Sequence, residues 1–101
     1  MVHIKRLIIA GRFAFTSKAE RAMFADDLTE EDVLESILNA NGIRKTLRST
    51  SKSSIGKEKL YVIESFTYDG VLVCTKGVIK KFEGEDRFYL LVSSKVSTSP
   101  R

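Results

Sequence analysis

The residues of this chain that could do chemistry are tyrosines, lysines and arginines. The sequence contains one histidine, one cysteine and no tryptophan. A catalytic triad built on imidazole, or a zinc site built on His and Cys, therefore lacks its usual members. A tyrosine or lysine with a lowered pKa can transfer protons, and Arg and Lys can stabilise the charge that develops on a phosphorane. These residue types suffice to cleave RNA by attack of its own 2′-hydroxyl.

The cations in the second half of the chain fall into three groups, each on a predicted strand. Adjacent strands lie roughly 4.8 Å apart, so residues distant in sequence can form one basic patch. A patch of this kind suits the phosphate backbone of a nucleic acid. For Lys76, function and an exposed edge charge are equally good explanations. The groups are Arg44, Lys45 and Arg48; Lys76, Lys80 and Lys81; and Arg87 and Lys95.

Strand alternation predicts how the last strand is oriented. Residues 87 to 95 divide into an odd and an even series that point to opposite faces. The even series, which contains Phe88 and Leu90, is the more apolar. We therefore expect the even series to face the helices, and Tyr89 to share the open surface with Lys95. Exposed tyrosines can stack on unpaired bases, but any of the three tyrosines in this chain could equally be a half-buried strand former.

The composition describes one small, basic domain. The 101 residues are 43% hydrophobic and 30% charged, with a formal net charge of +4. This balance makes an anionic partner such as nucleic acid plausible without requiring one. The lone Cys74 cannot form an internal disulfide, and we expect it to be a buried small hydrophobe in a reducing compartment.

Neither a membrane span nor a signal peptide is predicted. No window approaches the roughly 18 consecutive apolar residues that a span requires. Near the N-terminus two cations precede the short run LIIA, but this run is shorter than a signal sequence needs, and Arg12 follows at once. We expect a cytoplasmic protein that uses neither a metal nor a cofactor.

The N-terminal part of the chain predicts three helices. Apolar residues at helical spacing indicate a helix over 2–10, which Gly11 ends. Ser17 begins the sequence SKAE, a capping box that predicts a helix over 18–24. Thr29 is the expected N-cap of a third helix, which three acidic residues stabilise and Asn41-Gly42 closes.

After Ile43 the period becomes that of strands. We predict strands at 12–16, 43–48, 59–67, 71–81 and 86–94, with turns at 68–70 and 83–86. The Ser-rich segment 49–56 is expected to be a mobile loop, and 96–101 a disordered tail. Residues 1–101 would thus form one α+β domain, with two to three N-terminal helices on one face of an antiparallel sheet of four to five strands.

Three segments carry a resemblance to a known family. They are IKRLIIAGRFAFTSKA at 4–19, DVLESIL at 32–38 and LLVSSK at 90–95. Their order resembles the MqsR-like branch of the RelE-type toxins of bacterial type II toxin-antitoxin modules, over most of the chain except the Ser-rich loop and the tail. The resemblance implies a RelE-like fold and an mRNA interferase, a metal-independent endoribonuclease that halts translation. The implied partners are a cognate antitoxin, mRNA on or off the ribosome, and a second copy of the chain.

The resemblance also selects site residues. One alignment of the strands places the family's lysines at Lys45 and Lys95, with Leu72 where the family has a tyrosine. The other selects Tyr61 and Lys76. We therefore predict that Lys45 and Lys95 contact the scissile phosphate, that Lys76 supports them, and that Tyr61 transfers a proton or stacks on a base. The residues predicted to bind RNA are Arg44, Arg48, Lys80, Arg87 and Tyr89.

Two alternatives stay open at this point. One is a non-catalytic module of the same fold that binds RNA or a protein. The other is a structural or regulatory protein whose basic residues serve only solubility. Growth arrest on expression would separate an active toxin from either of them.

Overall fold

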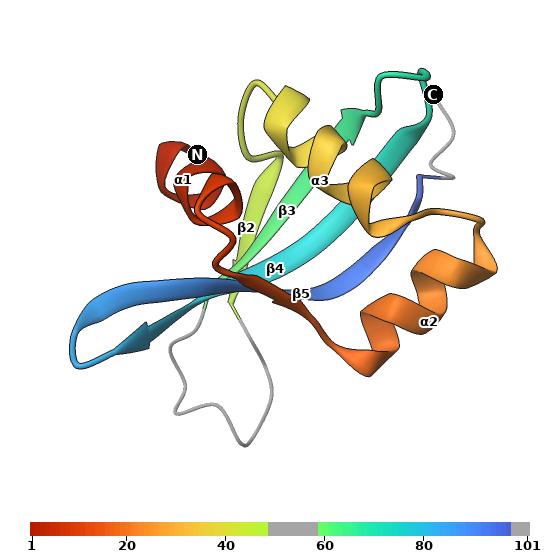
Figure 1. Cartoon of the computed structure of the whole chain (residues 1–101). Helices are drawn as coiled ribbons and strands as arrows, with labels where there is room; N and C mark the ends of the chain where they lie inside the picture. Colours follow the sequence, from red (N-terminus) through yellow and green to blue (C-terminus); the bar gives the residue numbers. More distant parts are fainter. Residues whose placement is uncertain (49–58, 98–101) are drawn as a thin grey trace.

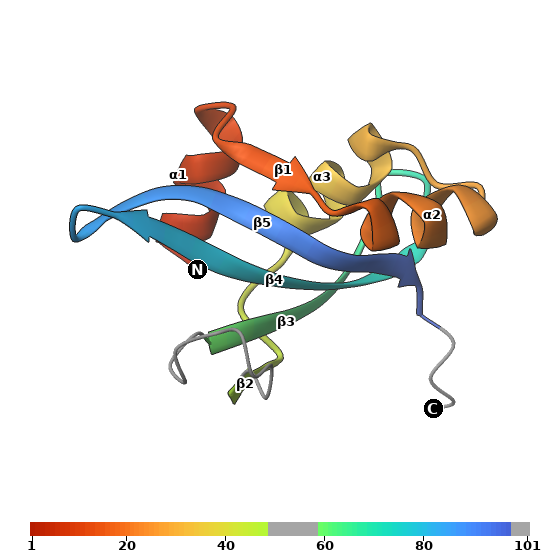
Figure 2. The same cartoon turned by 90° about the horizontal axis from the view of Figure 1, so that it is seen from below.

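Three helices cover one face of a five-stranded sheet (Figures 1 and 2). The computed structural model describes residues 1–48 and 59–97, without the side chains of Arg48, Phe82, Asp86 and Arg87. The Ser-rich segment predicted to be mobile, residues 49–56, lies outside these residues. No helix in the described part of the chain is both long and apolar enough to cross a membrane.

Helix α1 (Val2–Ile9) forms where the apolar spacing predicts it. Ile4, Leu7 and Ile8 are buried on one side of the helix. Gly11 has a φ of 75°, a left-handed conformation that glycine adopts without penalty, and it ends the helix as expected. Lys5 extends from α1 and donates a hydrogen bond to the carbonyl of Ala40 at 2.7 Å, which joins α1 to the end of the third helix.

Helix α2 (Ser17–Ala25) begins one residue earlier than predicted. The side chain of Thr16 accepts a hydrogen bond from the backbone amide of Ala19 at 3.1 Å, so Thr16 is the N-cap. Ser17, the predicted cap, is the first helical residue. Both residues carry a hydroxyl that can cap a helix, so the sequence pattern could not choose between them.

Helix α3 (Glu30–Asn39) starts at Thr29, as predicted. Thr29 and Asp32 form a reciprocal capping box, with bonds of 3.1 and 3.0 Å between each side chain and the other residue's amide. Glu30 and Glu31 add negative charge at the positive end of the helix dipole. Val33 and Ile37 are fully buried, so the apolar stripe of α3 packs on the sheet.

The sheet follows the predicted strand sequence but is mixed rather than antiparallel. Four strands form an antiparallel meander, and β1 pairs in parallel with β5 at the sheet edge. The sequence of a three-residue strand carries no signal for its partner or direction, which explains this error. The strands are β1 (Phe13–Phe15), β2 (Lys45–Arg48), β3 (Lys59–Phe66), β4 (Leu72–Phe82) and β5 (Glu85–Val96), in the order β1-β5-β4-β3-β2.

The last strand extends further than predicted. Val96, expected to begin a disordered tail, ends β5, and its amide donates to the carboxylate of Asp26 at 2.9 Å. The Ser97 amide donates to the carbonyl of Leu72 at 2.8 Å. The disordered-tail prediction is therefore wrong for residues 96 and 97, because the edge of β4 and the end of α2 supply hydrogen-bond partners. Residues 98–101 lie outside the described part.

The core lies between the helices and one face of the sheet. Its sheet side includes Ile63, Val73, Tyr89 and Leu91, and the helices contribute the buried faces described above. Because side chains alternate along a strand, the neighbours of these residues point away from the helices. We call that second surface the open face.

Candidate functional site

The open face collects most of the predicted cationic residues. The strand register defines it as a series of rows that cross the sheet. Lys45, Val62, Lys76 and Ser93 form one row, and Glu64, Cys74 and Lys95 form the next. Further rows toward the two ends of β4 contain Phe66 with Leu72, Val78 with Leu90, and Lys80 with Phe88.

Three lysines from three strands meet near the centre of this face. Lys45 and Lys76 both pair with Val62, so their backbones are two strand spacings, roughly 10 Å, apart. Lys76 pairs with Ser93, which places Lys95 at the diagonal position, about 7 to 8 Å from Lys76. Lys45 and Lys95 are three strand spacings, at least about 14 Å, apart. The structure thus brings together the lysines selected by the two alternative alignments.

These three lysines lack acidic partners within the described part of the chain. No ion pair joins Lys45, Lys76 or Lys95 to a described carboxylate. Lys45 and Lys95 are exposed and Lys76 is partly buried. Like charges at this spacing repel one another, and a bound anion would relieve that repulsion. Lys80 lies on the same face at the Phe88 row, is partly buried and has an interaction partner.

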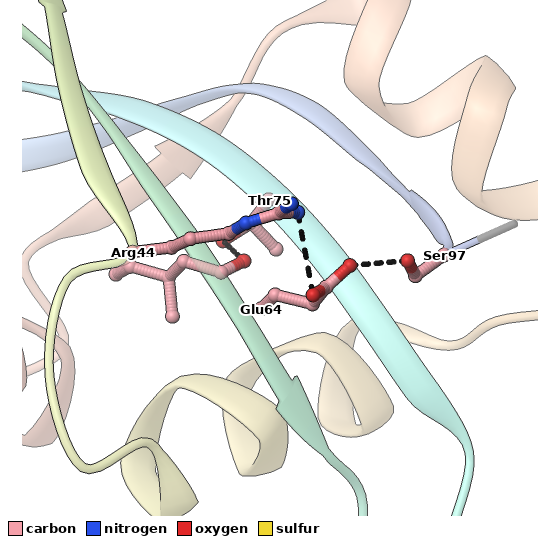
Figure 3. Close-up of polar contacts among 5 residues, drawn as sticks. Arg44, Glu64, Thr75 and Ser97 are labelled. Atoms are coloured by element: carbon pink, nitrogen blue, oxygen red, sulfur yellow. Dashed lines mark hydrogen bonds and ion pairs between the residues drawn. The ribbon is translucent and has the colours of Figure 1, made fainter. Parts of the chain in front are cut away.

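One carboxylate, that of Glu64, lies in the central rows of the open face. Its Oε1 is 3.3 Å from a guanidinium nitrogen of Arg44, and its Oε2 accepts a hydrogen bond from the Ser97 hydroxyl (Figure 3). The Glu64 side chain is 20% exposed and the Arg44 side chain 48%. Arg44, predicted to bind RNA, therefore reaches the face as half of an ion pair with Glu64.

A β-bulge reverses the expected orientation of Tyr89. Gly77 pairs with Leu91 while the preceding Lys76 pairs with Ser93, so Val92 is an extra residue in β5. The insertion changes which parity faces the helices, because each strand alternates with a period of two. Tyr89 is consequently in the core, with 0% of its surface exposed, and Lys95 is exposed on the open face. The expectation that Tyr89 and Lys95 share a surface, and with it the assignment of Tyr89 to RNA binding, is wrong.

The Tyr89 hydroxyl is buried without a hydrogen-bond partner among the described residues. Burial is the main cause that raises the pKa of Tyr89 above its ordinary value of 10.0, and nearby Tyr61 raises it further. This tyrosine keeps its proton at any physiological pH. It is not a general base, and its ring cannot reach a nucleic acid.

Tyr61 is also on the helix side of the sheet. It pairs with Thr46 and Gly77, one position out of phase with Lys45 and Lys76, and it packs partly buried against the core. Its predicted role in proton transfer requires it to act with those lysines, and the sheet separates them. Tyr68 is exposed in the turn between β3 and β4.

The remaining sequence predictions concern two arginines, the cysteine and metal binding. The side chains of Arg48 and Arg87, predicted to bind RNA, lie outside the described residues. Cys74, expected to be buried, is half-buried on the open face between Glu64 and Lys95. Among the described residues, no group of His, Cys, Asp and Glu side chains is arranged to hold a metal ion.

Three open-face residues were missed from the sequence. Glu64 shares the alternation of Val62 in β3, and Phe66 continues it, so a parity argument for this strand would have found both. Phe88 was placed toward the helices because the bulge was not foreseen. Phe66 and Phe88 are 52% and 36% exposed, large values for aromatic rings.

A second surface feature lies away from the open face. An open cleft of about 630 Å³ separates α1 from the turn that joins β4 to β5. Arg6, Arg12 and His3 line it together with Glu85, so its positive charge is partly balanced. None of the predicted site residues whose side chains the structure describes lines this cleft, and the open face remains the stronger candidate.

Comparison with known proteins identifies no relative of this chain. No family model, curated protein or solved structure matches the chain. The case for function therefore rests on the residues of the open face.

Proposed function

We propose that this protein binds RNA on the open face of its sheet. The observation that carries the proposal is the cluster of Lys45, Lys76 and Lys95 on one face of the sheet. Lys76 lies within about 10 Å of each of the other two, and none of the three has a described acidic partner. A phosphate backbone carries regularly spaced negative charge, and its release of counterions on binding would favour association with such a cluster.

The shape of the surface favours an extended polyanion over a small anion. The rows from Leu72 to Lys80 extend over about 26 Å of β4, if each residue adds roughly 3.3 Å. Cations occur in most of these rows, whereas Glu64 is the carboxylate in the central ones. The resemblance of the sequence to RelE/MqsR-like toxins supports RNA as the polyanion.

A narrower proposal is that the protein cleaves the RNA it binds, as a toxin of a type II toxin-antitoxin module with a RelE-like fold. The 2′-oxygen would attack the adjacent phosphorus as its proton passes to a neutral lysine amine. A protonated lysine would give a proton to the departing 5′-oxygen, and the remaining cation would stabilise the phosphorane. The products would be a 2′,3′-cyclic phosphate and a 5′-hydroxyl.

One observation favours the non-catalytic alternative. Tyr61 and Tyr89 lie on the helix side of the sheet, so the described open face offers lysines, an arginine and Glu64 for proton transfer but neither of these phenols. A module that only binds RNA needs no such group. Binding and cleavage should therefore be measured separately.

The test uses the purified chain and a ten-nucleotide, end-labelled, single-stranded RNA at low salt with a chelator present. We expect binding that weakens in Lys45→Ala, Lys76→Ala and Lys95→Ala, while Lys18→Ala on α2, an exposed control cation, binds like the original chain. Equal binding by all four variants would overturn the proposal. A cyclic-phosphate product that Lys95→Ala abolishes would establish cleavage. Bound RNA that stays uncut would support the non-catalytic RNA-binding module.

Growth tests the toxin proposal directly. Expression of the chain in bacteria should arrest growth, and Lys95→Ala should relieve the arrest. Tolerated expression of the original chain, together with RNA binding in vitro, would favour the non-catalytic module.

A further inference from the structure

The open face has an aromatic ring near each end of its basic region. Phe66 ends β3 in the row beyond Glu64, and Phe88 pairs with Lys80 near the β4–β5 turn. The lysine cluster lies between these two rows. Phe66 is 52% exposed and Phe88 36%, although burial of a phenylalanine ring normally stabilises a fold.

We propose that Phe66 and Phe88 are stacking platforms for unpaired bases, and that they make the open face selective for single-stranded RNA over duplex. This inference rests on the proposed RNA binding and names the form of RNA that is bound. Proteins that bind single strands combine a positively charged track for the backbone with aromatic side chains on which bases stack. The open face has both elements on one surface.

The position of the rings favours a nucleic acid over a protein as their partner. Phe88 lies directly opposite Lys80, and Phe66 lies one row from the row of Glu64, Cys74 and Lys95, so the two rings border the basic region at its two ends. In a duplex the base faces are covered by neighbouring pairs, and neither ring could reach one. In a single strand the faces are available, and every base has one, so stacking tolerates different sequences.

The local backbone holds Phe66 in place without using its ring. The carbonyl of Phe66 accepts a hydrogen bond from the Asn39 side chain at 3.0 Å, and its strand partner is Leu72. Replacement of the ring should therefore leave the end of β3 intact. Phe24 on α2 is 63% exposed and lies on the helix side of the sheet, so it provides a matched control.

The distance between the platforms suggests the length of the probe. The rows of Phe66 and Phe88 are separated by the β4 segment from Leu72 to Lys80, about 26 Å. At roughly 3.4 Å per stacked nucleotide, seven to eight nucleotides would cover that length. A ten-nucleotide strand is thus long enough to reach both rings.

The experiment measures the affinity of the full chain for ten-nucleotide oligo(A) and oligo(U), and for an RNA duplex of the same length. We expect Phe66→Ala and Phe88→Ala each to weaken single-strand binding by about 5- to 150-fold, the range for loss of one stacked base. Phe24→Ala should bind like the original chain, and Phe66→Trp should retain affinity. Duplex binding should be weaker than single-strand binding and insensitive to both substitutions.

A spectroscopic readout separates stacking from a purely structural effect. An oligonucleotide with 2-aminopurine should change its fluorescence on binding to the original chain and to Phe24→Ala, and less on binding to Phe66→Ala or Phe88→Ala. Phe66→Leu, which keeps an apolar side chain but no ring, should lose most of the signal. Thermal unfolding of each variant establishes that it folds.

The outcomes are distinguishable. If Lys95→Ala weakens binding but both folded phenylalanine variants bind single strands like the original chain, the stacking inference is overturned and the RNA-binding proposal stands. If the original chain binds no RNA, both fail. If the phenylalanine substitutions abolish self-association of the chain without changing RNA affinity, the rings serve a protein contact and the inference is overturned.

Discussion

The ring of Tyr89 lies directly over Gly77. A Cβ atom at residue 77 would be 2.5 Å from the Tyr89 hydroxyl oxygen and 2.6 Å from Cε2, closer than such atoms approach in proteins. Gly77 pairs with Leu91, next to the bulge in β5. The absence of a side chain at Gly77 thus makes room for the aromatic ring that the bulge turns into the core.

We expect Gly77→Ala to destabilise the fold. The added methyl group must displace the buried Tyr89 ring or the backbone of β4, and overpacking of this kind costs about 1 to 3 kcal/mol. Gly42→Ala is the matched control, since a Cβ there would meet nothing within 4 Å. Urea unfolding of both variants checks the prediction, and equal midpoints would show that Tyr89 does not depend on the space above Gly77.

The Tyr89 hydroxyl should contribute nothing favourable to stability at neutral pH. It is buried without a described partner, so Tyr89→Phe should leave the free energy of unfolding unchanged or raise it by up to about 2 kcal/mol. The pH dependence of the free energy of unfolding gives a more specific test of the Tyr89 hydroxyl. Because burial raises the pKa of Tyr89 in the folded state, the unfolded chain loses this proton near pH 10 while the folded chain keeps it.

Deprotonation of Tyr89 therefore leaves the free energy of unfolding unaffected below about pH 10 and lowers it progressively as pH rises above 10 toward the raised folded value. The slope from this one group is about 1.4 kcal/mol per pH unit. Urea unfolding between pH 9 and 11.5 should show a smaller alkaline loss for Tyr89→Phe than for the original chain. Parallel curves would mean that the Tyr89 hydroxyl is paired or solvated.

Local chemistry made much of the fold predictable. The Thr29 capping box, the glycine after α1 and the turns between the later strands involve residues close in sequence, and each of them is observed. The mixed sheet was not predictable, because the parallel pairing of β1 with β5 joins residues that are far apart in sequence. Nothing within Phe13–Phe15 encodes that distant partner.

The candidate site was only half predictable for a related reason. Lys45, Lys76 and Lys95 were selected from sequence, and their strands place them on one face. The orientation of Tyr89 was missed, since the segment Leu90-Leu91-Val92 is apolar throughout and has no alternation that could reveal an inserted residue. One bulge therefore moved Tyr89 out of the site and Phe88 into it.

The salt dependence of RNA affinity should show how many phosphates the lysines contact. For single strands the logarithm of the binding constant falls with the logarithm of salt concentration, with a slope of about −0.7 per neutralised phosphate. We expect Lys76→Ala and Lys95→Ala each to reduce the magnitude of that slope by about 0.7, and Lys18→Ala to leave it unchanged. Titrations between 50 and 300 mM salt measure it. A weaker affinity with an unaltered slope would show that these lysines act through folding.

Glu64 should limit the affinity of the open face for RNA. Its carboxylate lies one row from Lys45 and Lys76, pairs with Arg44, and accepts a hydrogen bond from Ser97. In Glu64→Gln the amide oxygen can still accept from Ser97, while the negative charge is gone and Arg44 is released. Removal of one charge about 10 Å from a bound phosphate should raise affinity by roughly two- to tenfold at low salt.

A matched control for Glu64→Gln is Glu31→Gln, which makes the same change in net charge on an exposed position of α3. The gain in RNA affinity should be specific to Glu64→Gln and should shrink as salt increases, because screening weakens interactions between exposed charges. Filter binding of the ten-nucleotide RNA at 50 and 300 mM salt measures both effects. A fall in affinity would contradict the prediction and would mean that Glu64 holds Arg44 in the position from which it contacts the phosphate backbone.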